Sequence, residues 1–292
     1  MSLTFRKMHG LGNDFVILDN RDYGYSLTAD EVRHLADRRQ GIGCDQVIVL
    51  EKPHKDRDKV DAFMRIFNAD GSEAGACGNA TRCVASLLMG ETNREVVAIE
   101  TLAGVLIGRA VQTGAEASLI EIDMGRPKFE WSSIPMARDM DTRRLDLRLD
   151  DPHGLSLAGP SAVNMGNPHC VFFVDTLEAL DVASLGAAVE RHALFPEGCN
   201  VSFAHITSPD TIRVRVWERG AGLTSACGSA ACAVGVAAAR RNLAERRTKI
   251  LLDGGALTIT WREADDHVLM AGPIAATFHG VIDPGLLSRA IG

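Results

Sequence analysis

The sequence predicts an α+β protein with two pseudo-symmetric domains, each a curved, mostly antiparallel sheet wrapped around a central helix. Three observations support this fold class. The chain has 292 residues, enough for two ordinary domains. Short β-branched or alternating segments separated by glycine-rich turns recur along it. The same series of motifs also occurs twice in the same order. We expect the domains to cover residues 1–125 and 126–272, with the boundary in the MGRP segment, Met124 to Pro127.

Each half opens with a Gly-Asn turn that leads into an apolar strand, LGNDFVILD in the first half and MGNPHCVFFVD in the second. A helix signal follows each strand. Thr28 and Glu31 form a capping-box pattern that opens TADEVRHLADRRQ, and Asp181 is placed to cap DVASLGAAVERH. A Gly-Cys turn and a further strand come next, GIGCDQVIVLE and PEGCNVSFAHI. Gln46 follows Asn13 by 33 residues, and Asn200 follows Asn167 by the same interval.

The third pair of motifs contains the cysteines that carry the predicted chemistry. NADGSEAGACGNATRC and WERGAGLTSACGSAAC both include Ala-Cys-Gly, at Cys77 and Cys227, and Asn68 and Glu218 each precede their cysteine by nine residues. The following segments, GNATRCVASLLM and GSAACAVGVAAARRN, are helical and small or apolar on nearly every face, which predicts buried helices. The strand-like segments around them are AFMRIF, VVAIET, LIEIDM, TIRVRVW, KILLD, ALTITW and HVLMAG.

Composition excludes several classes of function. The net charge of −7 offers no positive field for nucleic acid or an anionic membrane. No apolar run approaches the ~18 residues that a membrane span needs, and the N-terminal segment lacks the apolar core of a signal peptide. We therefore expect a cytoplasmic protein. Seven cysteines without an export signal indicate reduced thiols and not a disulfide framework.

A cysteine at the start of a helix faces unpaired backbone N–H groups and the positive end of the helix dipole, which favour the thiolate and also bind a carboxylate. If the two halves approach one substrate from opposite sides, Cys77 and Cys227 can remove a proton from one face of a carbon and return it to the other. This is stereoinversion. The two thiols would then titrate as a coupled pair and give a bell-shaped pH profile.

Other interpretations of the cysteines remain open at this point. Free cysteine is often simply buried, which is the interpretation we favour for Cys83 and Cys232 and for Cys44, Cys170 and Cys199. Pairing Cys77 with Cys83, and Cys227 with Cys232, could indicate a redox or zinc protein, but the Cys-x-x-Cys spacing of common zinc sites is absent. A non-catalytic amino-acid-binding protein would need the polar groups but no paired thiols.

Polar residues in the repeated turns are candidates for holding an amino-acid substrate. His169 could tune a thiolate or orient the substrate. Glu218 suits an ammonium group, and Arg219 suits a carboxylate held through two hydrogen bonds. The remaining candidates are neutral amides that repeat beside the cysteines: Asn13, Gln46, Asn68, Asn167 and Asn200.

Four motifs, HGLGNDFVILD, NADGSEAGACGN, MGNPHCV and ERGAGLTSACGS, together resemble the diaminopimelate epimerase family, and the resemblance runs from Lys7 to Gly280. It implies the fold of that family, and interconversion of LL- and meso-2,6-diaminoheptanedioate in lysine and peptidoglycan precursor synthesis without pyridoxal phosphate, any other cofactor or a metal. It also implies a homodimer, and a segment 273–292 that completes the N-terminal domain. By position, the resemblance makes Cys77 and Cys227 the acid and base, with His169 and Glu218 tuning them. Implied substrate contacts are Asn13, Gln46, Asn68, Gly78, Asn79, Asn167, Asn200, Glu218, Arg219, Gly228 and Ser229.

Two small departures from the family pattern fall just after the cysteine turns, in GNATRC and GSAAC, and we expect them to change local packing and not the substrate. The nearest rival is a proline or hydroxyproline racemase of the same fold, which has no need of Arg219 at a distal carboxylate. Because both sulfurs must flank one carbon, we also expect oxidative inactivation that a thiol reductant reverses.

Overall fold

The structure is a computed structural model that describes residues 3–54, 58–113, 117–150, 156–283 and 285. The chain divides into two compact units. Unit 1 comprises Met1–Ile122 and Gly272–Gly292, and unit 2 comprises Asp123–Ala271. Among the described residues, no helix is both long enough and apolar enough to cross a membrane.

Unit 1 contains one curved sheet. Its strand order is β19-β1-β2-β3-β4-β6-β7; the pairs β2–β3 and β4–β6 are parallel, and the other neighbours are antiparallel. The elements, in chain order, are β1 (Leu3–Gly10), β2 (Asn13–Asp19), α1 (Ala29–Ala36), β3 (Gln46–Glu51), β4 (Ala62–Asn68), β5 (Glu73–Ala74), α2 (Gly78–Thr92), β6 (Val96–Thr101), β7 (Gly104–Thr113), β8 (Ala117–Asp123) and β19 (Ala275–Ile282). The C-terminal strand β19 therefore pairs with the N-terminal strand β1.

Unit 2 repeats this topology. Its sheet has the order β11-β12-β13-β14-β16-β17-β18, with parallel pairs at β12–β13 and β14–β16. The elements are η1 (Trp131–Ser133), β9 (Arg148–Asp150), β10 (Ser156–Ala158), β11 (Ser161–Asn164), β12 (Pro168–Phe173), α3 (Val182–Glu190), β13 (Asn200–Ser208), β14 (Thr211–Glu218), β15 (Gly222–Thr224), α4 (Gly228–Arg240), β16 (Arg247–Leu252), β17 (Gly255–Trp261) and β18 (Val268–Gly272).

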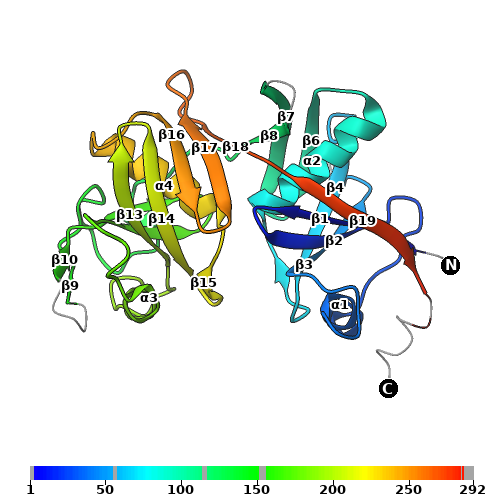
Figure 1. The fold of residues 1–292 in the computed structure, drawn as a ribbon, viewed down its shortest axis with the longest axis horizontal. Coiled ribbons are helices and arrows are strands. Elements are labelled where there is room, and N and C mark those ends of the chain that lie inside the picture. Colours follow the sequence, from blue (N-terminus) through cyan, green and yellow to red (C-terminus); the bar gives the residue numbers. More distant parts are fainter. Residues whose placement is uncertain (1–2, 55–57, 114–116, 151–155, 284, 286–292) are drawn as a thin grey trace. The chain divides into compact units, whose positions relative to one another are not determined.

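One helix is enclosed by the strands of each unit (Figure 1). Helix α2 contacts β1, β2, β6 and β7, while α4 contacts β11, β12, β13, β14, β16 and β17. Small side chains permit this enclosure, since Ala80, Cys83 and Ala85 of α2 and Ala230 to Ala233 of α4 are fully buried. The predicted α+β fold, with curved sheets around central helices, is confirmed.

The strand register accounts for the repeated spacing in the sequence. Phe15 of β2 lies opposite Gln46 of β3, and His169 of β12 lies opposite Asn200 of β13. Because both pairs are parallel and in the same register, each repeated Gly-Asn turn lies at the same end of the sheet as the polar residue that follows it by 33 positions.

Helix α1 is shorter than TADEVRHLADRRQ predicted. The Thr28–Glu31 capping box forms as expected, but the helix ends at Ala36, and the chain then folds back. Ile42 and Cys44 donate their backbone N–H groups to the carbonyls of Leu35 and Ala36 at 3.0 and 3.1 Å. Gly41 makes this return possible, because a Cβ there would lie 1.9 Å from the His34 carbonyl oxygen.

The sequence assigned no role to the segment 138–160, of which the structure describes residues 138–150 and 156–160 as part of unit 2. Strands β9 and β10 form a separate two-stranded sheet, and Leu145, Leu147 and Leu157 enter the core beneath β12 and β13. Arg240 and Arg241, at the end of α4, donate to Thr142 Oγ1 and to the Gly159 carbonyl at 2.9 and 3.0 Å.

Candidate active site

The two candidate catalytic cysteines occupy equivalent positions in the fold. Cys77 is the N-cap residue of α2 and Cys227 is the N-cap residue of α4, both with extended backbone conformations. Gly78 and Gly228 are the first helical residues. At these ends the first backbone N–H groups have no acceptor within the helix, so each cysteine lies beside a local positive potential that can hold an anionic group.

In unit 1, Asn13 contacts two residues at the start of α2, Cys77 and Asn79. The half-buried Cys77 donates from Sγ to Asn13 Oδ1 over 3.9 Å, and Asn79 Nδ2 donates to the same oxygen at 3.2 Å. Asn79 is 3% exposed, and its own amide oxygen accepts no hydrogen bond from the described residues. The first Gly-Asn turn therefore lies directly against the cysteine that follows it by 64 residues.

Gln46 and Asn68 form a second amide pair in unit 1. They lie opposite each other on β3 and β4, and Gln46 Nε2 donates to Asn68 Oδ1 at 2.9 Å. The Gln46 amide oxygen is buried and accepts no hydrogen bond from the described residues. Because buried carbonyl oxygens normally accept a hydrogen bond, this oxygen is suited to a donor such as a substrate ammonium.

In unit 2, Cys227 is 6% exposed, and its surroundings strongly favour the thiol. Burial is the largest cause that raises the pKa of Cys227 well above its usual value, and the nearby Glu218 carboxylate raises the pKa further. A contact of 3.5 Å between Cys227 Sγ and Ser229 Oγ acts in the opposite direction. Glu218 itself accepts a hydrogen bond from Thr224 Oγ1 at 2.5 Å.

His169 is completely buried on β12 and holds the Asn167 amide. Its Nε2 lies 2.7 Å from Asn167 Oδ1, so Nε2 is the protonated ring nitrogen. Burial, and secondly the charge of Arg219, lower the pKa of His169 to about 3. The imidazole is therefore neutral at physiological pH, which suits orientation of Asn167 better than electrostatic stabilisation of a thiolate.

Asn200 connects the second Gly-Asn turn to the Glu218–Arg219 pair. Its Nδ2 donates to the Pro168 carbonyl at 3.1 Å, and its Oδ1 accepts from the Arg219 backbone N–H at 3.0 Å. The Arg219 guanidinium donates to the Glu197 carbonyl at 2.9 Å and lies in an exposed part of unit 2. Asn200 thus fixes the backbone that carries the candidate ligands for the distal end of the substrate.

The structure places the predicted site residues in two sets, one in each unit. In unit 1 the groups are Cys77 with Asn13, Gly78 and Asn79, and Gln46 with Asn68. In unit 2 they are Cys227 with Glu218, Gly228 and Ser229, His169 with Asn167, and Asn200 with Arg219.

The other five cysteines are buried in both units. Burial raises the pKa of Cys44 to about 11 and that of Cys83 to about 12, so these thiols stay protonated. Among the residues that the structure describes, no group of three or more His, Cys, Asp and Glu side chains is arranged to hold a metal ion.

Sequence reasoning missed a cluster of charged residues beside Asn13: Lys7, Asp14, Arg38 and Asp45. Asp14 and Asp45 each directly neighbour a residue of the repeat, Asn13 and Gln46, and this adjacency was the available signal. Their proximity depends on the parallel pairing of β2 with β3, which places the two turns side by side.

The family model for diaminopimelate epimerase matches residues 5–130 and 161–276. A diaminopimelate epimerase of Acidiphilium cryptum is 51% identical over 284 residues, which are 97% of this chain and 98% of that protein. One from Rhodospirillum centenum is 51% identical over 295 residues, covering 100% and 96% of the two chains, and one from Caulobacter vibrioides is 48% identical over 286 residues, covering 96% and 97%.

Solved structures of more distant proteins share the fold. A hydroxyproline epimerase of Agrobacterium vitis superposes with a TM-score of 0.67 at 16% identity, over 98% of this chain and 93% of that chain. A probable proline racemase of Agrobacterium radiobacter gives a TM-score of 0.65 at 17% identity, over 98% and 95%. The family model and the near-full-length relatives show that this chain belongs to the diaminopimelate epimerase family.

Proposed function

We propose that this protein is an isomerase that interconverts LL- and meso-2,6-diaminoheptanedioate in lysine and peptidoglycan precursor synthesis. The observation that carries the proposal is the duplicated cysteine: Cys77 and Cys227 are both N-cap residues of enclosed helices, in a chain 48–51% identical to diaminopimelate epimerases. The proline racemase alternative rests on fold likeness at 17% identity or less.

In the proposed mechanism, one sulfur acts as the base and the other as the acid. The thiolate takes the proton from the α-carbon, the electron pair stays on that carbon, and the thiol on the opposite face delivers its proton there. The reverse reaction exchanges the two roles. Both sulfurs must therefore reach the same carbon, and the two thiols must hold opposite protonation states when the substrate is bound.

The remaining site residues bind and orient the substrate in this proposal. The first backbone N–H groups of α2 and α4 bind the carboxylate of the reacting centre, where fixed dipoles also stabilise the developing carbanion. The buried amide oxygens of Gln46 and Asn79, which accept no hydrogen bond from the described residues, suit the ammonium. Glu218 and Arg219 bind the ammonium and carboxylate at the distal centre, the groups that distinguish diaminoheptanedioate from proline.

Two-sided proton transfer is tested by proton NMR in deuterium oxide, with LL-diaminopimelate, a reductant and no added cofactor. The wild-type protein should exchange one α-proton for deuterium and form the meso isomer, while L-proline in a parallel sample keeps its α-proton. Cys77→Ser and Cys227→Ser should each lower epimerisation by about 10²- to 10⁴-fold, the usual contribution of a general acid or base. Near wild-type turnover in either variant contradicts the two-base mechanism, and exchange on proline alone contradicts the substrate.

A cytoplasmic homodimer is the proposed cellular form. The location is proposed from the seven cysteines, which are all free thiols in the structure, and the dimer is proposed from the family resemblance. Light scattering coupled to size-exclusion chromatography tests the dimer: a mass near 31.4 kDa, the mass of one chain, at micromolar concentration contradicts it.

A further inference from the structure

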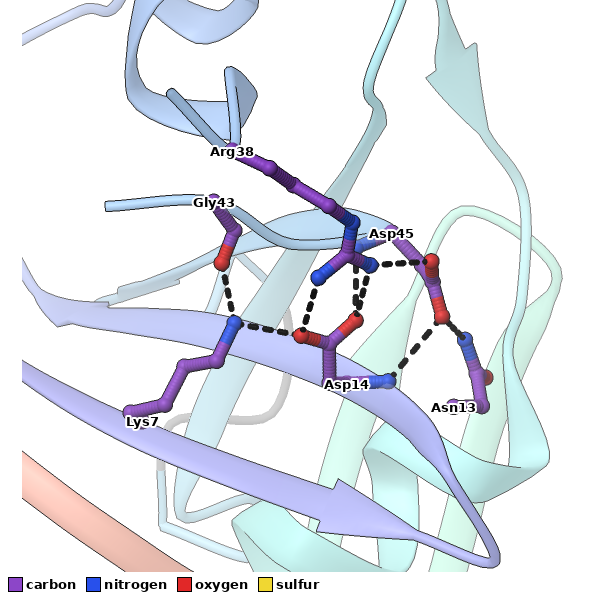
Figure 2. Close-up of polar contacts among 6 residues, drawn as sticks. All are labelled: Lys7, Asn13, Asp14, Arg38, Gly43 and Asp45. Carbon is purple, nitrogen blue, oxygen red and sulfur yellow. Dashed lines mark hydrogen bonds and ion pairs between the residues drawn. The ribbon is translucent and has the colours of Figure 1, made fainter. Parts of the chain in front are cut away.

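A charged cluster surrounds the Gly-Asn turn of unit 1 (Figure 2). Lys7 of β1 donates from Nζ to Asp14 Oδ2 at 2.5 Å and also to the Gly43 carbonyl. Arg38, in the segment after α1, donates to both carboxylate oxygens of Asp14 at 2.7 and 3.0 Å and to Asp45 Oδ1 at 2.7 Å. Two further bonds join the backbone N–H of Asp14 to Asp45 Oδ2, and that of Asp45 to Asp14 Oδ1, at 3.1 and 3.0 Å.

The cluster reaches Cys77 through one amide. Asp45 Oδ2 accepts a hydrogen bond from Asn13 Nδ2 at 2.9 Å, and the other end of that amide, Asn13 Oδ1, accepts from Cys77 Sγ and from Asn79 Nδ2. A carboxylate can only accept hydrogen bonds, so Asp45 binds the Nδ2 end of Asn13 and repels the Oδ1 end. The Asp45 contact therefore favours the orientation in which Asn13 Oδ1 faces the cysteine, and Asn79 Nδ2 supports the same orientation.

The cluster also fixes the position of Asp45 itself. Arg38 bridges the Asp14 and Asp45 carboxylates, and burial opposes but does not outweigh the Arg38 and Lys7 contacts, which hold the pKa of Asp14 far below its usual range. Asp14 therefore stays charged and keeps Arg38 in place over the physiological pH range.

Unit 2 shows that the fold does not need this cluster. Strands β11, β12 and β13 pair as β1, β2 and β3 do, in the same register, yet the cluster is absent from them. There the Asn167 amide is held by its opposite end, since His169 Nε2 donates to Asn167 Oδ1. At the positions equivalent to Lys7, Asp14 and Asp45, unit 2 has Ala162, Pro168 and Cys199.

We propose that Asp45 is a positioning residue that locks the Asn13 amide with its carbonyl oxygen toward the Cys77 sulfur, so that unit 1 holds this cysteine as a proton-donating thiol. The proposal extends the acid–base function proposed above for Cys77. Asp45 does not touch the reacting atoms in this scheme. It acts through Asn13, and Arg38, Asp14 and Lys7 hold it in position.

The orientation of the Asn13 amide has a measurable consequence for the Cys77 thiol. A carbonyl oxygen facing the sulfur accepts a hydrogen bond from the S–H group and opposes a negative charge there, whereas an N–H group facing the sulfur would stabilise the thiolate. Neutral Asn at position 45 can donate as well as accept, which frees the Asn13 amide to turn. The charged or titratable groups on the elements that pack around Cys77 and Asn13 include Arg82 and Cys83 on α2, Lys7 and His9 on β1, Asp14 on β2, and Arg38 and Asp45 before β3.

The test measures the rate of Cys77 alkylation by iodoacetamide against pH, with peptide mass spectrometry, in a Cys227→Ser background. Asp45→Asn should lower the midpoint by about one pH unit, equivalent to a tenfold higher thiolate-to-thiol ratio at a given pH. The matched control is Asp19→Asn. Asp19 ends the same strand β2 and is ion-paired with Arg21, but is not part of the cluster, so its loss should leave the midpoint unchanged.

A double-mutant cycle separates positioning from a direct charge effect. In an Asn13→Ala background, Asp45→Asn should no longer move the midpoint, because the amide that transmits the effect is gone. An unchanged midpoint in Asp45→Asn, or a shift of the same size without Asn13, overturns the proposal. Thermal unfolding shows whether each variant is folded. If Asp45→Asn fails to fold, Asp45→Ser replaces it in the same comparison. Because alkylation needs no substrate, a shift in Cys77 alkylation without any diaminopimelate turnover would refute the proposed reaction and leave this positioning role intact.

Discussion

The Glu218 carboxylate lies beside the Cys227 thiol and, after burial, is the next largest cause of its raised pKa. The two residues come from different elements, since Glu218 ends β14 and Cys227 begins α4. A negative charge at this place opposes formation of the thiolate, so unit 2 holds Cys227 protonated. A substrate ammonium bound to Glu218 would neutralise this charge and so couple substrate binding to the ionisation of Cys227.

Replacing Glu218 by Gln should therefore lower the pKa of Cys227. The amide removes the negative charge while burial remains, so the thiolate forms at lower pH than in the wild type but still above the ordinary cysteine range. Alkylation of Cys227 against pH, in a Cys77→Ser background, measures the shift. Glu178→Gln in the same unit, whose carboxylate binds Thr176 at 2.7 Å, serves as the control. A midpoint that stays in place or rises would contradict this electrostatic assignment.

Arg219→Lys should raise the KM for diaminopimelate about tenfold or more and change kcat much less. A lysine ammonium cannot make the paired hydrogen bonds by which a guanidinium binds a carboxylate, so substrate binding weakens at the distal end. Steady-state kinetics measure both constants. Arg215→Lys on β14, whose partner is Asp253 at 3.8 Å, is the control and should leave KM unchanged. A large loss in kcat at unchanged KM would place Arg219 in the chemical step instead.

Mild oxidation should inactivate the enzyme, and dithiothreitol should restore it. In the proposed mechanism both sulfurs reach one carbon, so the two thiols can lose two protons, give two electrons to the oxidant and join as a disulfide. The remaining cysteines are 0–2% exposed, against 6% for Cys227, and are not used in the proposed mechanism, so they should stay reduced. Peptide mass spectrometry should find a crosslink between Cys77 and Cys227 in the inactive protein. Inactive, oxidised protein without this crosslink would refute the prediction.

Gly186→Ala should destabilise the protein by about 1–3 kcal/mol, the usual cost of overpacking. Gly186 on α3 packs against Trp217, and a Cβ there would lie 2.5 Å from the Trp217 side chain. Trp217 directly precedes Glu218, so the strain should also lower activity. Gly90→Ala on α2 is the matched control, since a Cβ there meets no atom within 4 Å and alanine favours helix. Thermal unfolding measures the stability of both variants. Equal midpoints would show that the contact between α3 and Trp217 accommodates the added Cβ without a loss of stability.

The internal repeat was visible in the sequence because it resides in local patterns. The spacing of Asn13 from Gln46 and of Asn167 from Asn200 corresponds to the same strand register in both units, and Cys77 and Cys227 each begin a helix, as the Ala-Cys-Gly motifs predicted. Turn residues, helix caps and apolar periodicity act between near neighbours along the chain, so they can be interpreted without coordinates.

The sequence by itself determined the duplicated fold, the two cysteine turns and the family. Only the tertiary structure decided how the cysteine surroundings differ between the units: the Asp45 carboxylate holds Asn13 in unit 1, a neutral His169 holds Asn167 in unit 2, and Glu218 raises the pKa of a buried Cys227. These properties depend on burial and on charges contributed by residues distant in the chain. Asp45 is 32 residues from Asn13, and only the pairing of β2 with β3 brings them into contact.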